Sequence, residues 1–186
     1  MDRAFVFIDG SNFYHKIKEL TSHTNIKYRL LDFNYYEFSK WLVKPNDLIE
    51  VRYYIGAIKR RHNNDKSEQL YADQQRLLAK LKQQNISFVL GQLIQHPDKT
   101  FHEKGVDVRL SVEMIRFARQ NKYDSAYLIS SDTDLVAAVE EVKSFNKKVN
   151  YIGTAKGQSF GLSKISDNII LLRTDDIEQF LPKVLV

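Results

Sequence analysis

The chain of 186 residues contains no cysteine, which excludes disulfides and thiolate metal sites. It also lacks any apolar run that approaches the roughly 20 residues of a membrane helix. The first predicted strand follows Met1 almost directly, which leaves no room for a signal peptide. Together, these absences predict a cytoplasmic protein with no membrane span.

The composition is otherwise that of an ordinary globular protein. Hydrophobic residues make up 43% and charged residues 27% of the chain, close to the average of soluble domains. The length predicts one domain over residues 1–186, large enough to bury a full core. The net charge of +5 is mildly basic and suits a polyanionic partner such as a nucleic acid, although charge alone is weak support for one.

Short apolar runs, which predict strands, alternate with amphipathic segments, which predict helices. This order implies right-handed βαβ units and a parallel sheet with helices on both faces. We therefore expect an α/β fold with three layers, Rossmann-like, around a central and mainly parallel sheet. The predicted strands are residues 4–8, 48–58, 86–94, 127–130, 149–152 and 169–172, and the predicted helices are residues 13–20, 34–43, 67–84, 105–119, 135–145 and 160–165, with a last turn at 175–181.

A glycine-rich nucleotide-binding loop is also missing. The first predicted strand, residues 4–8, is an unbroken apolar run, as expected for a strand covered on both faces. It is followed by Asp9, Gly10, Ser11 and Asn12, without the G-x-G-x-x-G pattern of a dinucleotide-binding domain. Gly10 permits a tight turn here, and Ser11 or Asn12 can cap the next helix.

The stretch from Tyr127 to Leu135 is the most informative part of the chain. An apolar run ends abruptly in two serines, followed by Asp132 and Asp134, and a helical pattern then begins. This order is typical of a buried parallel strand that runs into a strand-to-helix turn, and ligands bind at that edge of an open α/β sheet. Capping of the helix would explain one of the two carboxylates but not both.

Two further acids are expected at the same edge of the sheet. Asp9 follows the first predicted strand, and Asp107 lies at the start of the helix after the third. Taken alone, Asp9 could be a turn residue and Asp107 an N-cap. If the fourth strand neighbours the first, Asp132 and Asp134 lie beside Asp9. Four carboxylates in one crevice repel one another, and Mg²⁺ or Mn²⁺, which would relieve that repulsion, also supports phosphoryl chemistry.

Two other residues are weaker candidates for this site. Glu113 could be a metal ligand, but it stands four residues after Arg109 and three before Arg116, so an exposed ion pair explains it equally well. Asn12 could support the acids or only cap the helix that follows the first strand.

Polar loops supply the remaining candidates. Lys59, Arg60 and Arg61 follow the second predicted strand, at the end of the sheet that carries the acids. They are either a solvated loop or a rim that contacts nucleic-acid phosphates. His96 and His102 lie in a later loop, where solvated histidines are more common than metal ligands.

Three motifs together resemble the NYN domain, the LabA-like branch of the PIN-like nuclease superfamily. They are residues 7–12 (FIDGSN), 104–110 (KGVDVRL) and 130–135 (SSDTDL), and their order and spacing match over nearly the whole chain. The resemblance implies a PIN-like α/β fold and metal-dependent hydrolysis of RNA. It assigns the metal ligands to Asp9, Asp107, Asp132 and Asp134, with Asn12 in support, and many relatives have an aspartate at the position of Glu113.

The function that these observations favour is a Mg²⁺- or Mn²⁺-dependent ribonuclease. The alternative is a catalytically weak regulator that keeps the fold and binds RNA or protein. A phosphatase of the haloacid-dehalogenase kind is disfavoured, because it needs Asp-x-Asp after the first strand and this chain has Ser11 two positions after Asp9. No added RNA-binding domain is evident, so we expect this domain, a protein partner or a second copy of the chain to select the substrate.

Overall fold

The computed structural model describes the whole chain except residues 25, 59–64, 96–100 and 184–186. In the described part, a six-stranded sheet lies at the centre in the order β3-β2-β1-β6-β7-β8, and every strand pair in it is parallel. Its strands are β1 (Arg3–Asp9), β2 (Asp47–Ile55), β3 (Ser87–Leu90), β6 (Ser125–Ile129), β7 (Lys148–Thr154) and β8 (Asn168–Leu172).

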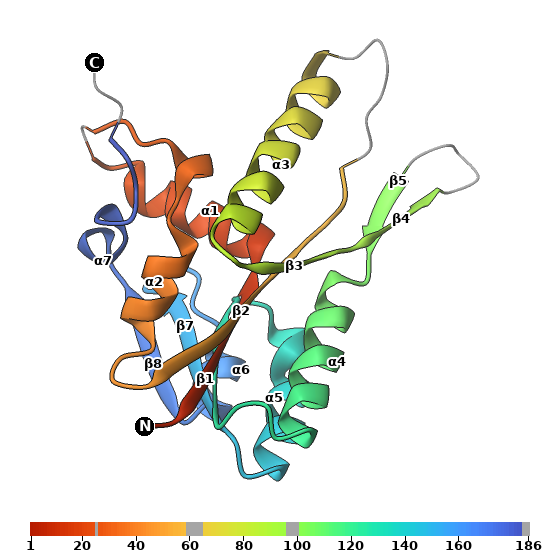
Figure 1. The fold of residues 1–186 in the computed structure, drawn as a ribbon, viewed down its shortest axis with the longest axis vertical. Helices are drawn as coiled ribbons and strands as arrows, with labels where there is room; N and C mark the ends of the chain where they lie inside the picture. The colour runs from red at the N-terminus through yellow and green to blue at the C-terminus, as the bar shows by residue number, and fades with distance from the viewer. Residues whose placement is uncertain (25, 59–64, 96–100, 184–186) are drawn as a thin grey trace.

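Helices cover both faces of this sheet, so the predicted three-layer α/β fold is confirmed (Figure 1). One face packs against α1 (Gly10–Thr21), α2 (Tyr35–Leu42), α3 (Asp65–Gln83) and α7 (Thr174–Glu178), and the other against α4 (Val106–Arg119), α5 (Val136–Ser144) and α6 (Phe160–Ile165). Short 3-10 helices lie at Leu30–Asp32 (η1) and Thr133–Leu135 (η2). No helix in the described residues is long and apolar enough to cross a bilayer.

The central position of β1 in the sheet explains why its sequence shows no alternation of polar and apolar residues. Val6 and Ile8 contribute to the core on the α1 face, whereas Phe5 and Phe7 contribute to the core on the α4 face. All four are almost completely buried. A strand in the middle of a parallel sheet has no solvent side, so every position favours an apolar residue.

The prediction of one strand over residues 86–94 is wrong, because the chain leaves the sheet at Gly91. Strand β3 pairs with β2 only as far as Leu90, opposite Ile55, where β2 ends. The next residues form β4 (Gln92–Gln95), which pairs antiparallel with β5 (Phe101–Lys104) in a separate two-stranded sheet. The loop predicted to contain His102 therefore includes β5, one strand of this hairpin.

The helical pattern of residues 67–84 predicts that Leu70 lies on the buried face of α3, but in the structure it does not. This side chain is 47% exposed, and the N-terminal half of α3 extends past the carboxyl end of the sheet (Figure 1). One turn further on, Gln74 is buried instead. Its amide donates to the Gly56 carbonyl at 2.6 Å and accepts from the Ile58 amide at 2.8 Å, so it fastens α3 to the segment that follows β2.

Candidate active site

The carboxyl ends of β1 and β6 form the switch point of the sheet. The two strands are neighbours, with Ile8 opposite Ile129, which confirms the expectation that the strand before Asp132 lies beside the first strand. The chain leaves β1 toward α1 on one face and leaves β6 toward α5 on the other face. Connections that diverge in this way leave a crevice between the strand ends, where α/β proteins bind ligands.

Asp9 lies at the centre of this crevice and also begins α1. One carboxylate oxygen accepts from the Asn12 backbone amide at 3.0 Å, and the other accepts from the Ser130 hydroxyl at 3.0 Å. The residue is only 7% exposed. Burial raises the pKa of Asp9, the two hydrogen bonds oppose that rise, and the charges of Asp107 and Asp132 add to it. The N-cap is therefore Asp9, and not Ser11 or Asn12 as predicted.

Asp132 has the same two roles just after β6, because it caps a helix and lines the crevice. Its carboxylate accepts from the Asp134 backbone amide at 2.9 Å and so caps η2, while its own amide donates to the Ser130 hydroxyl at 3.1 Å. Asp132 is half-buried and lines the crevice, but Asp134 is exposed and does not line it. The structure therefore brings one member of this pair into the crevice.

Asp107 enters from the opposite side, in the first turn of α4. The N-cap of α4 is Gly105, whose φ of +86° lies in the left-handed region, and not Asp107. Burial raises the pKa of Asp107, and the charges of Asp132 and Asp134 raise it further. Asp134 therefore affects the electrostatics of the crevice from outside it.

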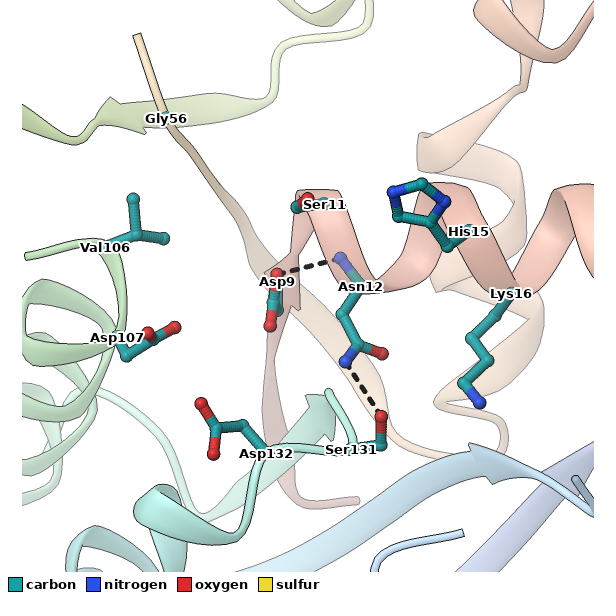
Figure 2. A pocket seen from close by; sticks show the side chains of 10 residues that line it. All are labelled: Asp9, Ser11, Asn12, His15, Lys16, Gly56, Val106, Asp107, Ser131 and Asp132. Carbon is teal, nitrogen blue, oxygen red and sulfur yellow. Dashed lines mark hydrogen bonds between the residues drawn. The ribbon is translucent and has the colours of Figure 1, made fainter. Parts of the chain in front are cut away.

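Asp9, Asp107 and Asp132 line one pocket of about 470 Å³, which we call the acidic pocket. Figure 2 shows the carboxylates of Asp9, Asp107 and Asp132 around a common space, with His15 and Lys16 on the α1 side. The described residues that line it are Asp9, Ser11, Asn12, His15, Lys16, Gly56, Val106, Asp107, Ser131 and Asp132.

The donors of the acidic pocket have the chemistry that a hard divalent cation prefers, because they are mainly carboxylate, amide and hydroxyl oxygens. Their spacing is looser than that of a finished metal site. In the described part of the chain, no group of three or more His, Cys, Asp or Glu side chains is close enough to hold a metal ion. The residue types therefore fit Mg²⁺ or Mn²⁺, and binding would require the carboxylates to move toward one another.

Asn12 braces the pocket from α1. Its side-chain amide donates to the Ser131 hydroxyl at 2.8 Å, while its backbone amide bonds to Asp9 (Figure 2). Asn12 thereby links the ends of β1 and β6, which is a supporting position rather than a cap.

Glu113 lies away from the acidic pocket. Its carboxylate accepts from the Arg52 guanidinium at 2.6 Å and from the Tyr54 hydroxyl at 2.7 Å, and it does not line the pocket. Among the described contacts, its ion pair is therefore with Arg52 of β2 and not with the predicted Arg109 or Arg116. The contact fixes α4 against the sheet and so positions Asp107 indirectly.

The predicted basic rim cannot be placed, since Lys59, Arg60 and Arg61 lie outside the described residues, as does His96. Their contact with phosphates stays a prediction. His102 belongs to β5, where its backbone pairs with Ile94.

Several pocket residues were missed from the sequence. His15 and Lys16 follow Ser11 and Asn12 by four residues, and residues at that spacing share one helix face, so the face that carries Asn12 could have been extended to them. The Lys16 ammonium donates to the Lys156 carbonyl at 2.9 Å. No sequence rule would have found Gly56 or Val106, which line the pocket only because of how distant elements pack.

Gly10 is required by close packing rather than by an unusual backbone angle. A Cβ atom at this position would lie 2.3 Å from Cε1 of Tyr53. Tyr53 is fully buried, and its hydroxyl donates to the Gly10 carbonyl at 3.3 Å and lies 3.4 Å from the Tyr35 hydroxyl. This packing holds the first turn of α1, and therefore Asp9, close to β2.

An acidic crevice at the switch point of a parallel sheet flanked by helices is the arrangement expected of a PIN-like α/β domain. The chain belongs to the NYN domain family, whose sequence profile matches residues 3–173. Membership suggests a relation to the PIN-like nucleases.

Among solved structures, the chain is similar to a protein of unknown function from Vibrio parahaemolyticus RIMD 2210633, with a TM-score of 0.66 and 22% identity over 97% of this chain and 96% of that chain. This likeness supports the fold alone. Comparison with curated proteins gave no match.

Proposed function

We propose that this protein is a divalent-metal-dependent ribonuclease that hydrolyses RNA phosphodiester bonds at the acidic pocket, with Mg²⁺ or Mn²⁺ as the cofactor. One observation carries the proposal. Asp9, Asp107 and Asp132 come from three elements far apart in the sequence, yet they line one pocket at the switch point of the sheet. Membership of the NYN family supports the same chemistry.

The raised pKa values of Asp9 and Asp107 support a cation at this site. Each is raised by burial and by the charge of neighbouring aspartates, so the pocket disfavours its own negative charge. Asp9, Asp107 and Asp132 would hold the ion, with Asp134 contributing charge from the rim. A divalent cation, when bound, supplies charge neutralisation at the phosphate and activation of a water molecule.

The remaining residues around the pocket would orient the acids and the substrate. The Asn12 backbone amide and the Ser130 hydroxyl orient the carboxylate of Asp9 through hydrogen bonds. Lys16 and His15 line the pocket opposite the acids (Figure 2). Lys16 has a positive charge at a distance from the acid cluster, and phosphate contacts of this kind position a nucleic acid without reading its sequence.

A second candidate function is a catalytically weak regulator that binds RNA or protein. The observation in its favour is the loose spacing of the acids, since no group of three in the described residues is close enough to hold a metal as it stands. The fold and the pocket would then be kept for recognition.

A cleavage assay separates the two candidates. Labelled RNA is incubated with the protein and Mg²⁺, Mn²⁺ or EDTA, and with the variants Asp9→Asn and Asp132→Asn. Glu140→Gln is the matched control, because Glu140 is an exposed acid on α5 that does not line the pocket. The ribonuclease proposal expects metal-dependent cleavage that both Asp variants reduce by orders of magnitude and the control leaves unchanged. RNA binding without cleavage in any metal supports the regulator.

A further inference from the structure

A second, apolar pocket lies directly beside the acidic pocket. Its volume is about 220 Å³, and it lies between α1, α3 and the segment that follows β2. The partly exposed Leu70 of α3 lines it, as does Tyr14 of α1. Among the described residues, its apolar lining consists of Tyr14, Leu31, Tyr53, Ile55, Ile58, Leu70 and Leu77.

Two elements connect the apolar pocket to the acidic pocket. Ser11 of α1 lines both. At the end of β2, Gly56 lines the acidic pocket, while Ile55 and Ile58 line the apolar one. Tyr14 follows Ser11 by three residues, about 4.5 Å along the axis of α1, so the two pockets adjoin at Ser11. A ligand with one group in the acidic pocket therefore places the neighbouring group of the same molecule in the apolar pocket.

A third hollow adjoins the apolar pocket on the side away from the acidic pocket. It has a volume of about 500 Å³ and shares Tyr14 and Leu31 with the apolar pocket. Its charged lining consists of Arg29, Arg76 and Lys80, with Asp32 as the one acid. We call it the basic hollow.

The cations of the basic hollow are available to a ligand. Lys80 pairs with Asp32 at 2.9 Å and Arg76 with Asp73 at 3.1 Å, and the side chains of Lys80 and Arg76 are 45% and 68% exposed. Ion pairs this exposed contribute little stability. Both cations can therefore exchange their carboxylate partner for a phosphate, and the three cations outnumber the two nearby acids, Asp32 and Asp73.

We propose that the apolar pocket is a nucleobase subsite, and that one single-stranded RNA passes through all three hollows. A phosphate lies in the acidic pocket, the adjacent base packs against Tyr14 and Leu70, and the next phosphate lies over the basic hollow. The order of the hollows matches the alternation of phosphate and base along a strand. A base that is paired in a duplex cannot enter a side pocket, so the substrate is single-stranded. This inference rests on the proposed function.

The polar groups of the subsite indicate that it does not select one base. The amide of Gln74 is already bonded to Gly56 and Ile58. Asp73 accepts from Gln69 at 2.9 Å, a bond that stays in place when Arg76 turns to a phosphate. With the Gln74 amide occupied and Asp73 bonded to Gln69, recognition comes mainly from apolar contact and stacking, which every base can provide.

The test measures binding of a short fluorescein-labelled RNA by anisotropy, with Ca²⁺ in place of Mg²⁺ or Mn²⁺ and the strand length checked afterwards. The probes are the single strand, its duplex and a sugar-phosphate strand without bases. The variants are Leu70→Ala and Tyr14→Ala, alone and together. Ile169→Ala on β8 is the matched control, because Ile169 is 45% exposed and Leu70 is 47% exposed.

The double variant should bind the single strand about tenfold more weakly than wild type, as expected for loss of one stacked base. It should bind the abasic strand as wild type does, because that strand has no base to lose. The duplex should bind weakly to every variant, and Ile169→Ala should behave as wild type. Melting curves confirm that the variants fold.

The outcomes also separate this inference from the proposed function. Metal-dependent cleavage with unchanged affinity in the double variant removes the subsite and leaves the ribonuclease. A base-dependent loss of affinity without any cleavage keeps the subsite and removes the ribonuclease. An equal loss for the intact and abasic strands overturns the base assignment, and absence of RNA binding overturns both proposals.

Discussion

Replacing Gly10 with alanine should destabilise the protein although alanine favours helices. The new Cβ would lie 2.3 Å, 2.5 Å and 2.7 Å from three atoms of the Tyr53 side chain. Tyr53 cannot turn away freely, because it is fully buried and packs edge-on against Tyr35 at 5.1 Å between ring centroids. The clash must therefore be relieved by moving α1 away from β2.

The size of the effect follows from three contributions. Overpacking of a well-filled core costs about 1–3 kcal/mol, and loss of the Tyr53 hydrogen bond to the Gly10 carbonyl adds about 1 kcal/mol. The better helix propensity of alanine offsets up to ~1 kcal/mol. The net loss of unfolding free energy is about 1–3 kcal/mol. For a chain of this length, that corresponds to a melting temperature lower by roughly 3–10 °C.

Thermal melting of Gly10→Ala, Tyr53→Leu and the double variant checks this reasoning. Shortening Tyr53 makes room for the Cβ, so the double variant should lose at least ~1 kcal/mol less than the sum of the single variants. Gly105→Ala is a useful contrast. It is strained by its φ of +86°, and no atom of the described residues beyond its chain neighbours lies within 4 Å of its added Cβ, so Tyr53→Leu should not rescue it. Strictly additive effects of Gly10→Ala and Tyr53→Leu would refute the packing account.

Three further predictions concern charge. Asp132→Asn should fold at least as well as wild type without metal, because it relieves repulsion in the acidic pocket, and Mn²⁺ should raise its melting temperature less; an unchanged Mn²⁺ shift would contradict this. Glu113→Gln should lower the unfolding free energy by about 1–3 kcal/mol, because Arg52 loses a charged partner, while the Mn²⁺ concentration for half-maximal cleavage stays the same. Hydrogen bonds from Arg3 hold the pKa of Asp124 below its usual value, so Asp124 stabilises the fold above its unfolded pKa of about 3.9 and loses this effect as the pH falls through its folded pKa. Asp124→Asn should therefore reduce stability at neutral pH by no more than about 1 kcal/mol, and denaturant melts at falling pH should show the difference from wild type shrinking.

The main sheet was predictable because its strands are mostly short apolar runs, which are buried between the two layers of helices. The hairpin of β4 and β5 was not, because neither strand has the unbroken apolar run of a buried strand. Gln74 was equally hidden, since its burial depends on the backbone groups of Gly56 and Ile58. A polar residue in a helical pattern is normally assigned to the solvent face.

The candidate site was predictable where strand ends determine it. Asp9 ends β1, Asp132 follows the adjacent β6, and Asp107 lies in the first turn of the helix that packs beside them, so topology alone brings them to one pocket. Glu113 shows where local spacing fails. Its partner Arg52 is 61 residues away in the sequence, and no rule for helix neighbours can identify a contact between a helix and a distant strand.

The double use of Asp9 and Asp132, as pocket acids and as helix caps, has an evolutionary consequence. Asparagine caps a helix about as well as aspartate, whereas alanine loses about 1 kcal/mol. A single exchange to asparagine therefore removes a charge while the helix still begins at the same place. A lineage could lose the proposed catalysis in this way without passing through an unstable ancestor, and it could regain that activity by reverting the same codon. Cleaving and merely binding members of such a family need differ at only one position.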